Sequence, residues 1–143
     1  MAILVTGGLG FIGSHTVVAL IENGYKVVIA DNLSNSQIDV LEKLEHITGE
    51  VIPFYEVDVT NESKVNAIFS QHTIEGVIHF AGYKAVGESV EQPLKYYANN
   101  LMSTIAVMNA CLKHNVKKFV FSSSATVYGD NAVPFKETMS LLP

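Results

Sequence analysis

The sequence predicts a doubly wound α/β fold on a mostly parallel sheet, built by one domain over residues 1–143. Short apolar runs alternate with longer helical stretches, which is the order of repeated β-α-β units. The first run, Ala2–Thr6, is continuously apolar up to its last residue, as expected for a strand that is buried on both faces. Gly7, Gly10 and Gly13 follow it and open a helix, so the chain is expected to turn sharply there.

The remaining strands are short runs rich in β-branched and aromatic residues, expected at residues 26–30, 51–57, 76–81 and 118–123. Pro53 weakens the start of the third strand because it cannot donate to a ladder. The helices are expected at residues 14–23, at 39–48, from Thr60 or Asn61 to about 72, and from Pro93 to about 115. Gly24 and Gly49 stop the first two helices. Asn61 is a suitable cap, and Pro93 suits a first helical position.

The longest helix carries an apolar stripe at spacings of three and four, formed by Leu94, Tyr97, Leu101, Ile105, Met108 and Leu112. This stripe is wider than packing on one sheet face requires. Residues 32–36 are expected to form a polar loop, and the tail from Tyr128 onward shows no strong period. No linker, repeat or low-complexity segment interrupts the alternation.

Composition narrows the class of protein. Of the 143 residues, 48% are hydrophobic and 16% are charged, which excludes intrinsic disorder. The single cysteine, Cys111, excludes a disulfide scaffold and a cysteine-based zinc cluster, and we expect it to be a small buried hydrophobe. No apolar run approaches the roughly 18 residues of a membrane span. A strand that starts at Ala2 leaves no room for a signal peptide, so we expect a soluble cytoplasmic protein.

The charge pattern bears on the ligand. The net charge is −5, and all nine basic residues are lysines, so binding to nucleic acid is not expected. Without arginine, a phosphate must be held by backbone N–H groups, hydroxyls or lysine. The five histidines have no metal-ligand spacing, so no metal is expected, and His79 is interpreted as a hydrogen-bonded core residue.

Gly7, Gly10 and Gly13 form a G-x-x-G-x-x-G spacing. Between a strand and a helix, such glycines allow a sharp turn, a close backbone approach to a pyrophosphate and tight helix–strand packing. The helix N-terminus adds positive potential without a charged side chain. The spacing therefore predicts a dinucleotide site in preference to a phosphate-free turn. Asp31, 18 residues after Gly13, can bind ribose hydroxyls and would repel a 2′-phosphate, which favours NAD over NADP.

Three further segments carry a narrower pattern. They are DNLSNS at residues 31–36, HFAGYKAVGES at residues 79–89 and SSSATVYG at residues 122–129. Together with TGGLGFIGSH at residues 6–15, they resemble the UDP-glucose 4-epimerase family of extended short-chain dehydrogenases/reductases. The resemblance runs from Ala2 to at least Gly129, and it implies a Rossmann fold with bound NAD that is incomplete at the C-terminus.

The resemblance implies cofactor contacts after each strand. Phe11 and Ile12 would lie over the pyrophosphate turn, with Lys84 as the one cation near the phosphates. Residues 31–36 would surround the adenosine ribose. The remaining contacts would come from Asp58 and Val59 at the adenine and from Phe80, Ala81, Gly82 and Tyr83 at the nicotinamide. The full implied set is Gly7, Gly10, Phe11, Ile12, Gly13, Asp31, Asn32, Leu33, Ser34, Asn35, Ser36, Asp58, Val59, Phe80, Ala81, Gly82, Tyr83, Lys84, Asn99 and Ser124.

For catalysis the resemblance implies Ser124, whose hydroxyl would bond the sugar 4-hydroxyl beside a tyrosine base. NAD takes the hydride from C4 of UDP-glucose or UDP-galactose in this family, and the 4-keto sugar turns over before receiving it back. A lysine four residues after the tyrosine lowers the pKa of that tyrosine. A serine run after a strand can also be turn chemistry, which is our expectation for Ser122 and Ser123.

None of the six tyrosines has a lysine four residues later. We therefore expect the amino-terminal fragment of an epimerase, without the C-terminal substrate-binding region and inactive alone. In the family the long helix joins a dimer interface, which implies a homodimer of the full-length protein. Two alternatives stay open. A sugar-nucleotide 4,6-dehydratase would have an acidic pair where Ala125 and Thr126 stand, and a non-catalytic NAD(H)-binding module would not need Ser124 or Lys84.

Overall fold

The computed structural model describes residues 1–142, and its centre is a five-stranded, wholly parallel sheet. The strands are β1 Ala2–Thr6, β2 Val27–Asp31, β3 Phe54–Glu56, β4 Ile74–His79 and β5 Lys118–Phe121. Their order across the sheet is β3-β2-β1-β4-β5. The chain thus moves outward from β1 to β3 and then returns to the other side of β1 at β4. This is the doubly wound arrangement that the alternation predicts.

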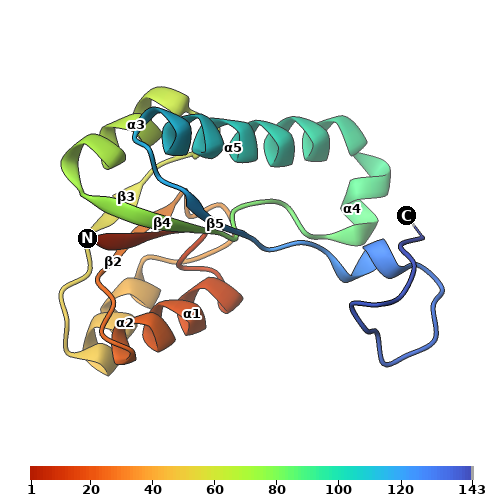
Figure 1. The fold of residues 1–143 in the computed structure, drawn as a ribbon, viewed down its shortest axis with the longest axis horizontal. Helices are drawn as coiled ribbons and strands as arrows, with labels where there is room; N and C mark the ends of the chain where they lie inside the picture. The colour runs from red at the N-terminus through yellow and green to blue at the C-terminus, as the bar shows by residue number, and fades with distance from the viewer. Residues whose placement is uncertain (143) are drawn as a thin grey trace.

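Helices cover both faces of the sheet (Figure 1). On one face lie α1 Phe11–Glu22 and α2 Asp39–Thr48, and on the other lie α3 Glu62–Gln71 and α5 Pro93–Lys113. The short α4 Val86–Glu91 precedes α5, and a 3-10 turn, η1 Ala125–Tyr128, follows β5. Asn61 caps α3 by accepting from the Lys64 N–H, as expected.

Two hydrophobic cores lie on either side of the sheet. Alternate residues of β1 supply them, because successive strand side chains point to opposite faces. Leu4 packs with Val65, Val107 and other residues of α3 and α5, whereas Val5 packs with Val17 and other residues of α1 and α2. All five residues of β1 and of β2 are buried. The apolar runs that form β1 and β2 are therefore strands covered on both faces.

Several element bounds differ from those expected. The first helix begins at Phe11, not at residue 14, because Gly10 is its N-cap and Gly13 sits inside its first turn without breaking it. β3 has three residues, since Pro53 supplies only its carbonyl oxygen, which accepts from the Ile29 N–H. β4 begins earlier than predicted because Ile74 pairs with Ala2. The helix α4 was not predicted, and β5 ends at Phe121 rather than at residue 123.

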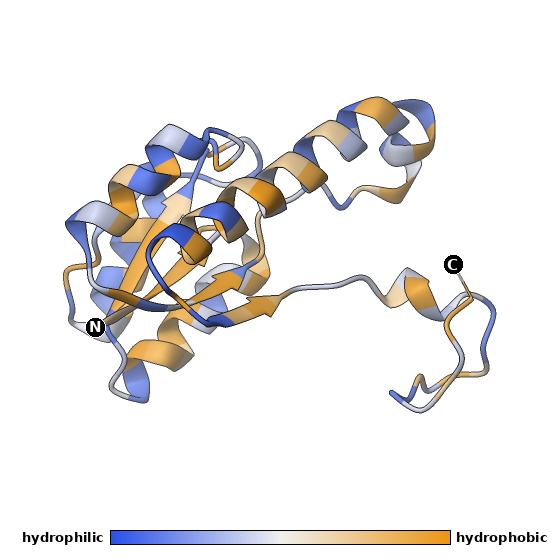
Figure 2. Ribbon diagram, turned by 45° about the horizontal axis from the view of Figure 1, so that its top comes forward, coloured by the Kyte–Doolittle hydropathy of each residue, from blue (hydrophilic) through white to orange (hydrophobic). Residues whose placement is uncertain are grey.

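The apolar stripe of α5 faces away from the sheet. Its side chains are between 48% and 81% exposed, and they are Leu94, Tyr97, Leu101, Ile105, Met108 and Leu112. Figure 2 shows hydrophobic residues recurring along this helix. The face turned to the sheet carries mostly small side chains such as Ser103, Ala106 and Ala110, which allow close packing. Cys111 belongs to this buried face, and burial raises the pKa of its thiol to about 11.

Beyond β5 the chain leaves the sheet and folds back on itself (Figures 1 and 2). The Leu142 N–H donates to the Val127 carbonyl oxygen, and the rings of Tyr128 and Phe135 stack 5.1 Å apart. In the described chain, none of the helices has the length and hydropathy needed to cross a membrane.

Candidate functional site

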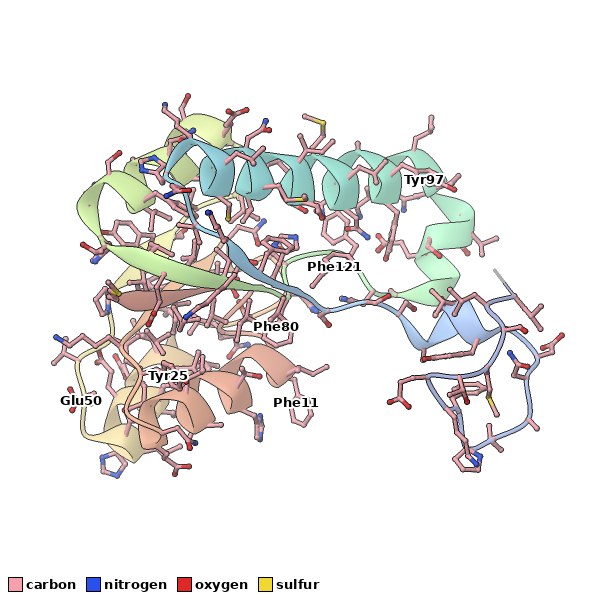
Figure 3. All side chains as sticks on the ribbon, in the orientation of Figure 1. Phe11, Tyr25, Glu50, Phe80, Tyr97 and Phe121 are labelled. Carbon is pink, nitrogen blue, oxygen red and sulfur yellow. The ribbon has the colours of Figure 1, made fainter. Side chains whose placement is uncertain are left out.

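A cleft of about 610 Å³ is lined by the segments that follow the carboxyl ends of the strands. It lies where the strand order reverses, between β1 and β4, and open α/β sheets bind their ligands at such a point. Figure 3 shows Phe11, Phe80 and Phe121 at this same end of the sheet. The fold therefore brings together segments that are more than 100 residues apart in sequence.

Most residues of the implied cofactor site line this cleft. They are Gly7, Gly10, Phe11, Ile12, Gly13, Asp31, Asn32, Ser34, Asn35, Ser36, Asp58, Val59, Phe80, Ala81, Gly82, Tyr83, Lys84 and Asn99. Leu33 and Ser124 are not part of the lining. Leu33 has a positive φ of 57° and packs against the core beside α1 and α2.

The glycine turn leaves no room for side chains. Gly7 has φ +68°, and a Cβ there would lie 2.8 Å from the Ala81 nitrogen. A Cβ on Gly13 would collide with the carbonyl oxygen of Gly7. Because α1 starts at Phe11 without a side-chain cap, its first N–H groups are free to meet an anion. The turn thus has the backbone approach and the helix dipole that a pyrophosphate requires.

Asp31 ties this turn to the end of β2. Its carboxylate accepts from the Leu9 N–H at 3.0 Å, from the Leu33 N–H at 3.0 Å and from the Ser36 hydroxyl at 2.9 Å. The residue is 8% exposed, so these bonds replace most of its hydration. A fixed negative charge therefore stands where a ribose could bind and where a further phosphate would be repelled.

The wall of the cleft for which the resemblance implies adenine contacts is formed after β3. The Asp58 carboxylate accepts from both the backbone N–H and the hydroxyl of Thr60, at 2.9 and 2.7 Å, which closes a tight local turn. Val59 beside it is buried in the core. The pair thus offers one polar and one apolar residue along this wall.

The loop after β4 is held by Asn100 of α5. The amide of Asn100 accepts from the Tyr83 N–H at 2.8 Å and donates to the Tyr83 carbonyl oxygen at 3.0 Å. These two hydrogen bonds fix the backbone of the loop against the helix. Sequence reasoning identified Asn99, which lines the cleft, but missed Asn100, because a positioning role of this kind has no motif.

Two lysines, Lys84 and Lys95, line the cleft. Lys84 donates to the Ser122 carbonyl oxygen at 3.2 Å, so its charge has no carboxylate partner there. Lys95 forms an ion pair with Glu88 and lies 5.0 Å above the Tyr83 ring. The hydrogen bond from Lys95 lowers the pKa of Glu88. Lys84 is thus the better candidate for an anionic ligand.

The cleft has further lining residues that sequence reasoning did not identify. They are Ala30, Val57, Ala85, Glu88, Lys95, Tyr96, Ser103 and Ser122. Glu88, which also accepts from the Tyr96 hydroxyl at 2.7 Å, joins α4 to the first turn of α5. The signal for this group was the seven-residue spacing between Glu88 and Lys95, which is visible as a contact only once α4 is recognised.

Ser124 lies on the segment that leaves the sheet after β5. Its hydroxyl is 2.7 Å from the Thr126 hydroxyl and accepts from the Thr126 N–H at 3.3 Å, so it caps the η1 turn. Ser122, interpreted from sequence as a turn residue, contributes to the cleft lining. Within residues 1–142, no three His, Cys, Asp or Glu side chains gather as a metal site.

Comparison with known proteins gives a consistent set of relatives. The model of the NAD dependent epimerase/dehydratase family matches residues 3–143. The UDP-glucose 4-epimerase of Dictyostelium discoideum is 56% identical over 140 residues, which are 97% of this chain and 41% of that protein. The chain thus spans about two fifths of the length of this curated relative.

Solved structures are similar over nearly the whole chain. The UDP-glucose 4-epimerase of Bifidobacterium longum, in complex with NAD+ and UDP, has a TM-score of 0.95 and 48% identity, covering 99% of this chain and 42% of that one. The enzyme of Stenotrophomonas maltophila, with bound NAD and formylated UDP-arabinopyranose, has a TM-score of 0.94 and 43% identity, covering 99% and 43%.

Proposed function

This chain belongs to the NAD dependent epimerase/dehydratase family, and we propose that it is the NAD-binding part of a UDP-glucose 4-epimerase. The observation that carries the proposal is the convergence of the glycine turn, Asp31 and the Lys84 loop on one cleft. Relatives at more than half identity include UDP-glucose 4-epimerases, and similar structures contain NAD. The proposed reaction interconverts UDP-glucose and UDP-galactose through a 4-keto sugar.

The residues present fit NAD. The glycine turn and the free N–H groups of α1 would hold the pyrophosphate, and Gly7 and Gly13 provide a cradle that a Cβ would fill. Asp31 would accept from the adenosine ribose hydroxyls, while Asp58 and Val59 would border the adenine. When bound, the cofactor supplies a reversible hydride acceptor. The loop from Phe80 to Lys84, with Asn99, would orient its nicotinamide end.

The preference for NAD over NADP is proposed from charge. The Asp31 carboxylate is buried and already bonded to two backbone N–H groups, so it stays in place when a ligand binds. A 2′-phosphate at the same ribose would meet this negative charge. No arginine is present in the sequence to neutralise it.

Ser124 is proposed as the residue that bonds the sugar 4-hydroxyl. Its hydroxyl is bonded to Thr126 and is outside the cleft lining, so this role requires the segment after β5 to lie closer to the cleft. None of the six tyrosines has a lysine four residues later. We therefore propose that the 143-residue chain alone does not epimerise UDP-galactose, since it lacks the paired base.

The exposed apolar stripe of α5 is proposed as the homodimer surface of the full-length protein. Six large apolar side chains lie outward on one helix, and a patch of this kind favours association when it is not covered. The cytoplasmic location and the single NAD-binding domain over residues 1–143 stay predictions.

The test is a calorimetric titration of the chain with NAD and with NADP. NAD is expected to bind, and NADP to bind at least tenfold more weakly. Asp31→Asn is expected to weaken NAD about tenfold, because hydrogen bonds to a charged group contribute about 1.5–3 kcal/mol. Asp130→Asn, an exposed aspartate of the tail, is the matched control and should bind as the unchanged chain does. Equal affinity for NAD and NADP would contradict the proposal, and turnover of UDP-galactose would contradict the expected inactivity.

A further inference from the structure

His79, the last residue of β4, is a buried histidine that does not line the cleft. It is 1% exposed, and its ring lies beside two rings of β5, with centroids 6.0 Å from both Phe119 and Phe121. A buried polar ring needs hydrogen-bond partners. Both of its nitrogens have one. Nδ1 is 2.7 Å from the Thr6 hydroxyl, and Nε2 is 3.3 Å from the Thr104 hydroxyl.

The direction of these bonds follows from the donors available. The Thr104 hydroxyl donates to the Asn100 carbonyl oxygen at 2.8 Å, so towards His79 it can only accept. Nε2 must then carry the proton, which leaves Nδ1 as an acceptor in the neutral ring. The Thr6 hydroxyl donates to Nδ1 and in turn accepts from the Ala81 N–H at 3.4 Å. One chain of hydrogen bonds, all donating in the same direction, therefore runs from the Ala81 N–H through the His79 imidazole to α5.

Both ends of this chain of hydrogen bonds contact the loop of residues 81–83, which borders the cleft. At one end the Ala81 nitrogen lies 2.8 Å from the place where a Gly7 Cβ would stand, so the position of Ala81 bears on the glycine turn. At the other end, Asn100 holds both backbone polar groups of Tyr83. The imidazole thus joins β1, β4 and α5 underneath residues 81–83.

We propose that His79 is a positioning residue, whose ring sets the backbone of residues 81–83 for the nicotinamide end of the cofactor. This rests on the proposed binding of NAD. The ring itself does not reach the cofactor cleft, because it is buried and absent from the lining.

The surroundings keep the ring neutral. Burial, and secondarily the charge of Lys84, lower the pKa of His79 to about 4. From β1, α5 and β5 the ring is met by Thr6, Thr104, Phe119 and Phe121, none of which is charged. A proton on Nδ1 would remove the acceptor of the Thr6 hydroxyl and reverse that end of the chain. At neutral pH the series of hydrogen bonds from Ala81 to α5 therefore runs in a single direction.

The first test is nitrogen NMR of the His79 ring in the chain without NAD. A neutral ring with its proton on Nε2 is expected. A proton on Nδ1, or a charged ring at pH 7, would overturn the assigned direction. This measurement needs neither a variant nor a ligand, so it is decided independently of the proposed function.

The second test compares Thr104→Val with Thr104→Ser. Valine has the shape of threonine but leaves the His79 Nε2–H without an acceptor, whereas serine keeps the hydroxyl. The Thr104→Val variant should exchange the Ala81 and Tyr83 amide hydrogens at least tenfold faster. It should also bind NAD about 2- to 10-fold more weakly, as expected for one hydrogen bond. Thr104→Ser should stay within twofold of the unchanged chain in both measurements.

The matched control is Thr48→Val on α2. Thr48 makes the same backward bond to a carbonyl oxygen four residues earlier, at 2.8 Å, and also accepts from a backbone N–H. The Thr48→Val variant should lose as much free energy of unfolding as Thr104→Val does, but its NAD affinity should not change. If Thr48→Val or Thr104→Ser weakens NAD as much as Thr104→Val does, the positioning role is overturned. If the unchanged chain does not bind NAD, the proposed function fails, and amide exchange still decides whether His79 orders the loop.

Discussion

At the glycine turn, backbone and side chains from three strands close on one another, whereas the segment after β5 bonds mainly with itself. Asp31 joins the ends of β1 and β2, and the Thr6–His79 bond joins β1 to β4. In the tail, by contrast, Asn131 donates to the carbonyl oxygens of Tyr128 and Ser140, at 2.7 Å each. Both regions carry residues of the implied site, but only the first is fixed by the sheet.

This difference separates the proposed cofactor site from Ser124, the residue proposed to bond the sugar. The proposed cofactor site is built from segments that follow the strand ends, so the pairing of the parallel strands positions it. Ser124 follows the edge strand β5, and its segment packs against neither of the two cores. Substitutions in the first region should therefore change stability and NAD affinity together, and substitutions in the tail should change neither.

The largest effect is expected from Gly13→Ala. The added methyl group would collide with the Gly7 carbonyl oxygen, which is backbone and cannot move without opening the turn. We expect a loss of about 3 kcal/mol in the free energy of unfolding, as for severe overpacking, and no measurable NAD binding. Urea unfolding and calorimetry check both. Gly87→Ala is the control, because a Cβ there meets no atom within 4 Å. A Gly13→Ala variant that binds NAD normally would remove the argument for a sterically closed turn.

The next largest effect is expected from His79, which should make the free energy of unfolding depend on pH. Its pKa of about 4 in the folded chain lies below the ordinary value of 6.5, so between these values the unfolded chain binds a proton that the folded chain does not. The free energy of unfolding should therefore fall as pH drops from 6.5 to 4, by about 3 kcal/mol from this group. Above pH 6.5 the histidine contributes no slope.

The measurement is urea unfolding of the unchanged chain and of His79→Gln from pH 4 to pH 7.5. His79→Gln should be less stable at pH 7 and should lack this part of the acid slope. His46→Gln, at an exposed histidine of α2, should keep it. A slope that is the same in all three proteins would show that His79 is not a buried neutral base.

The smallest effect is expected from Asn131→Ala in the tail. It removes two hydrogen bonds that close the segment on itself. Since the segment does not pack on the core, the free energy of unfolding should change by less than about 0.5 kcal/mol. NAD affinity should not change. Amide exchange within residues 125–142 should become faster, while exchange in β1 and β4 stays the same. A global loss of stability would mean that the tail supports the sheet.

Most of the fold could be predicted from the sequence because each strand is an apolar run between glycine or polar segments. The predictions failed where contacts with other segments decide whether a residue belongs to a strand or a helix. Ile74 is a strand residue because Ala2 pairs with it, and α4 is held by contacts of Glu88 with α5. The apolar stripe of α5 gives no indication by itself that its large side chains face outward and its small ones inward.

The site divides in the same way. Spacing and strand order were enough to predict that the glycine turn, Asp31 and the loop at Phe80 lie along one cleft, because the carboxyl ends of parallel strands meet at one edge of the sheet. Asn100, Glu88 and Lys95 were missed, since their roles depend on contacts between elements that no local pattern encodes. Ser122 in the lining, and Ser124 outside it, also depend on where the chain goes after β5.

The sequence by itself determined the order of strands and helices, the spacing of the glycines in the turn, and the acidic residue at the end of the second strand. These are local properties, fixed by hydrophobic period and backbone sterics. Only the tertiary structure decided which side chains face the cleft, which face of α5 is exposed, and that His79 is neutral. Those properties arise from burial and from partners far away in the chain, so they exist only once the sheet and its helices have assembled.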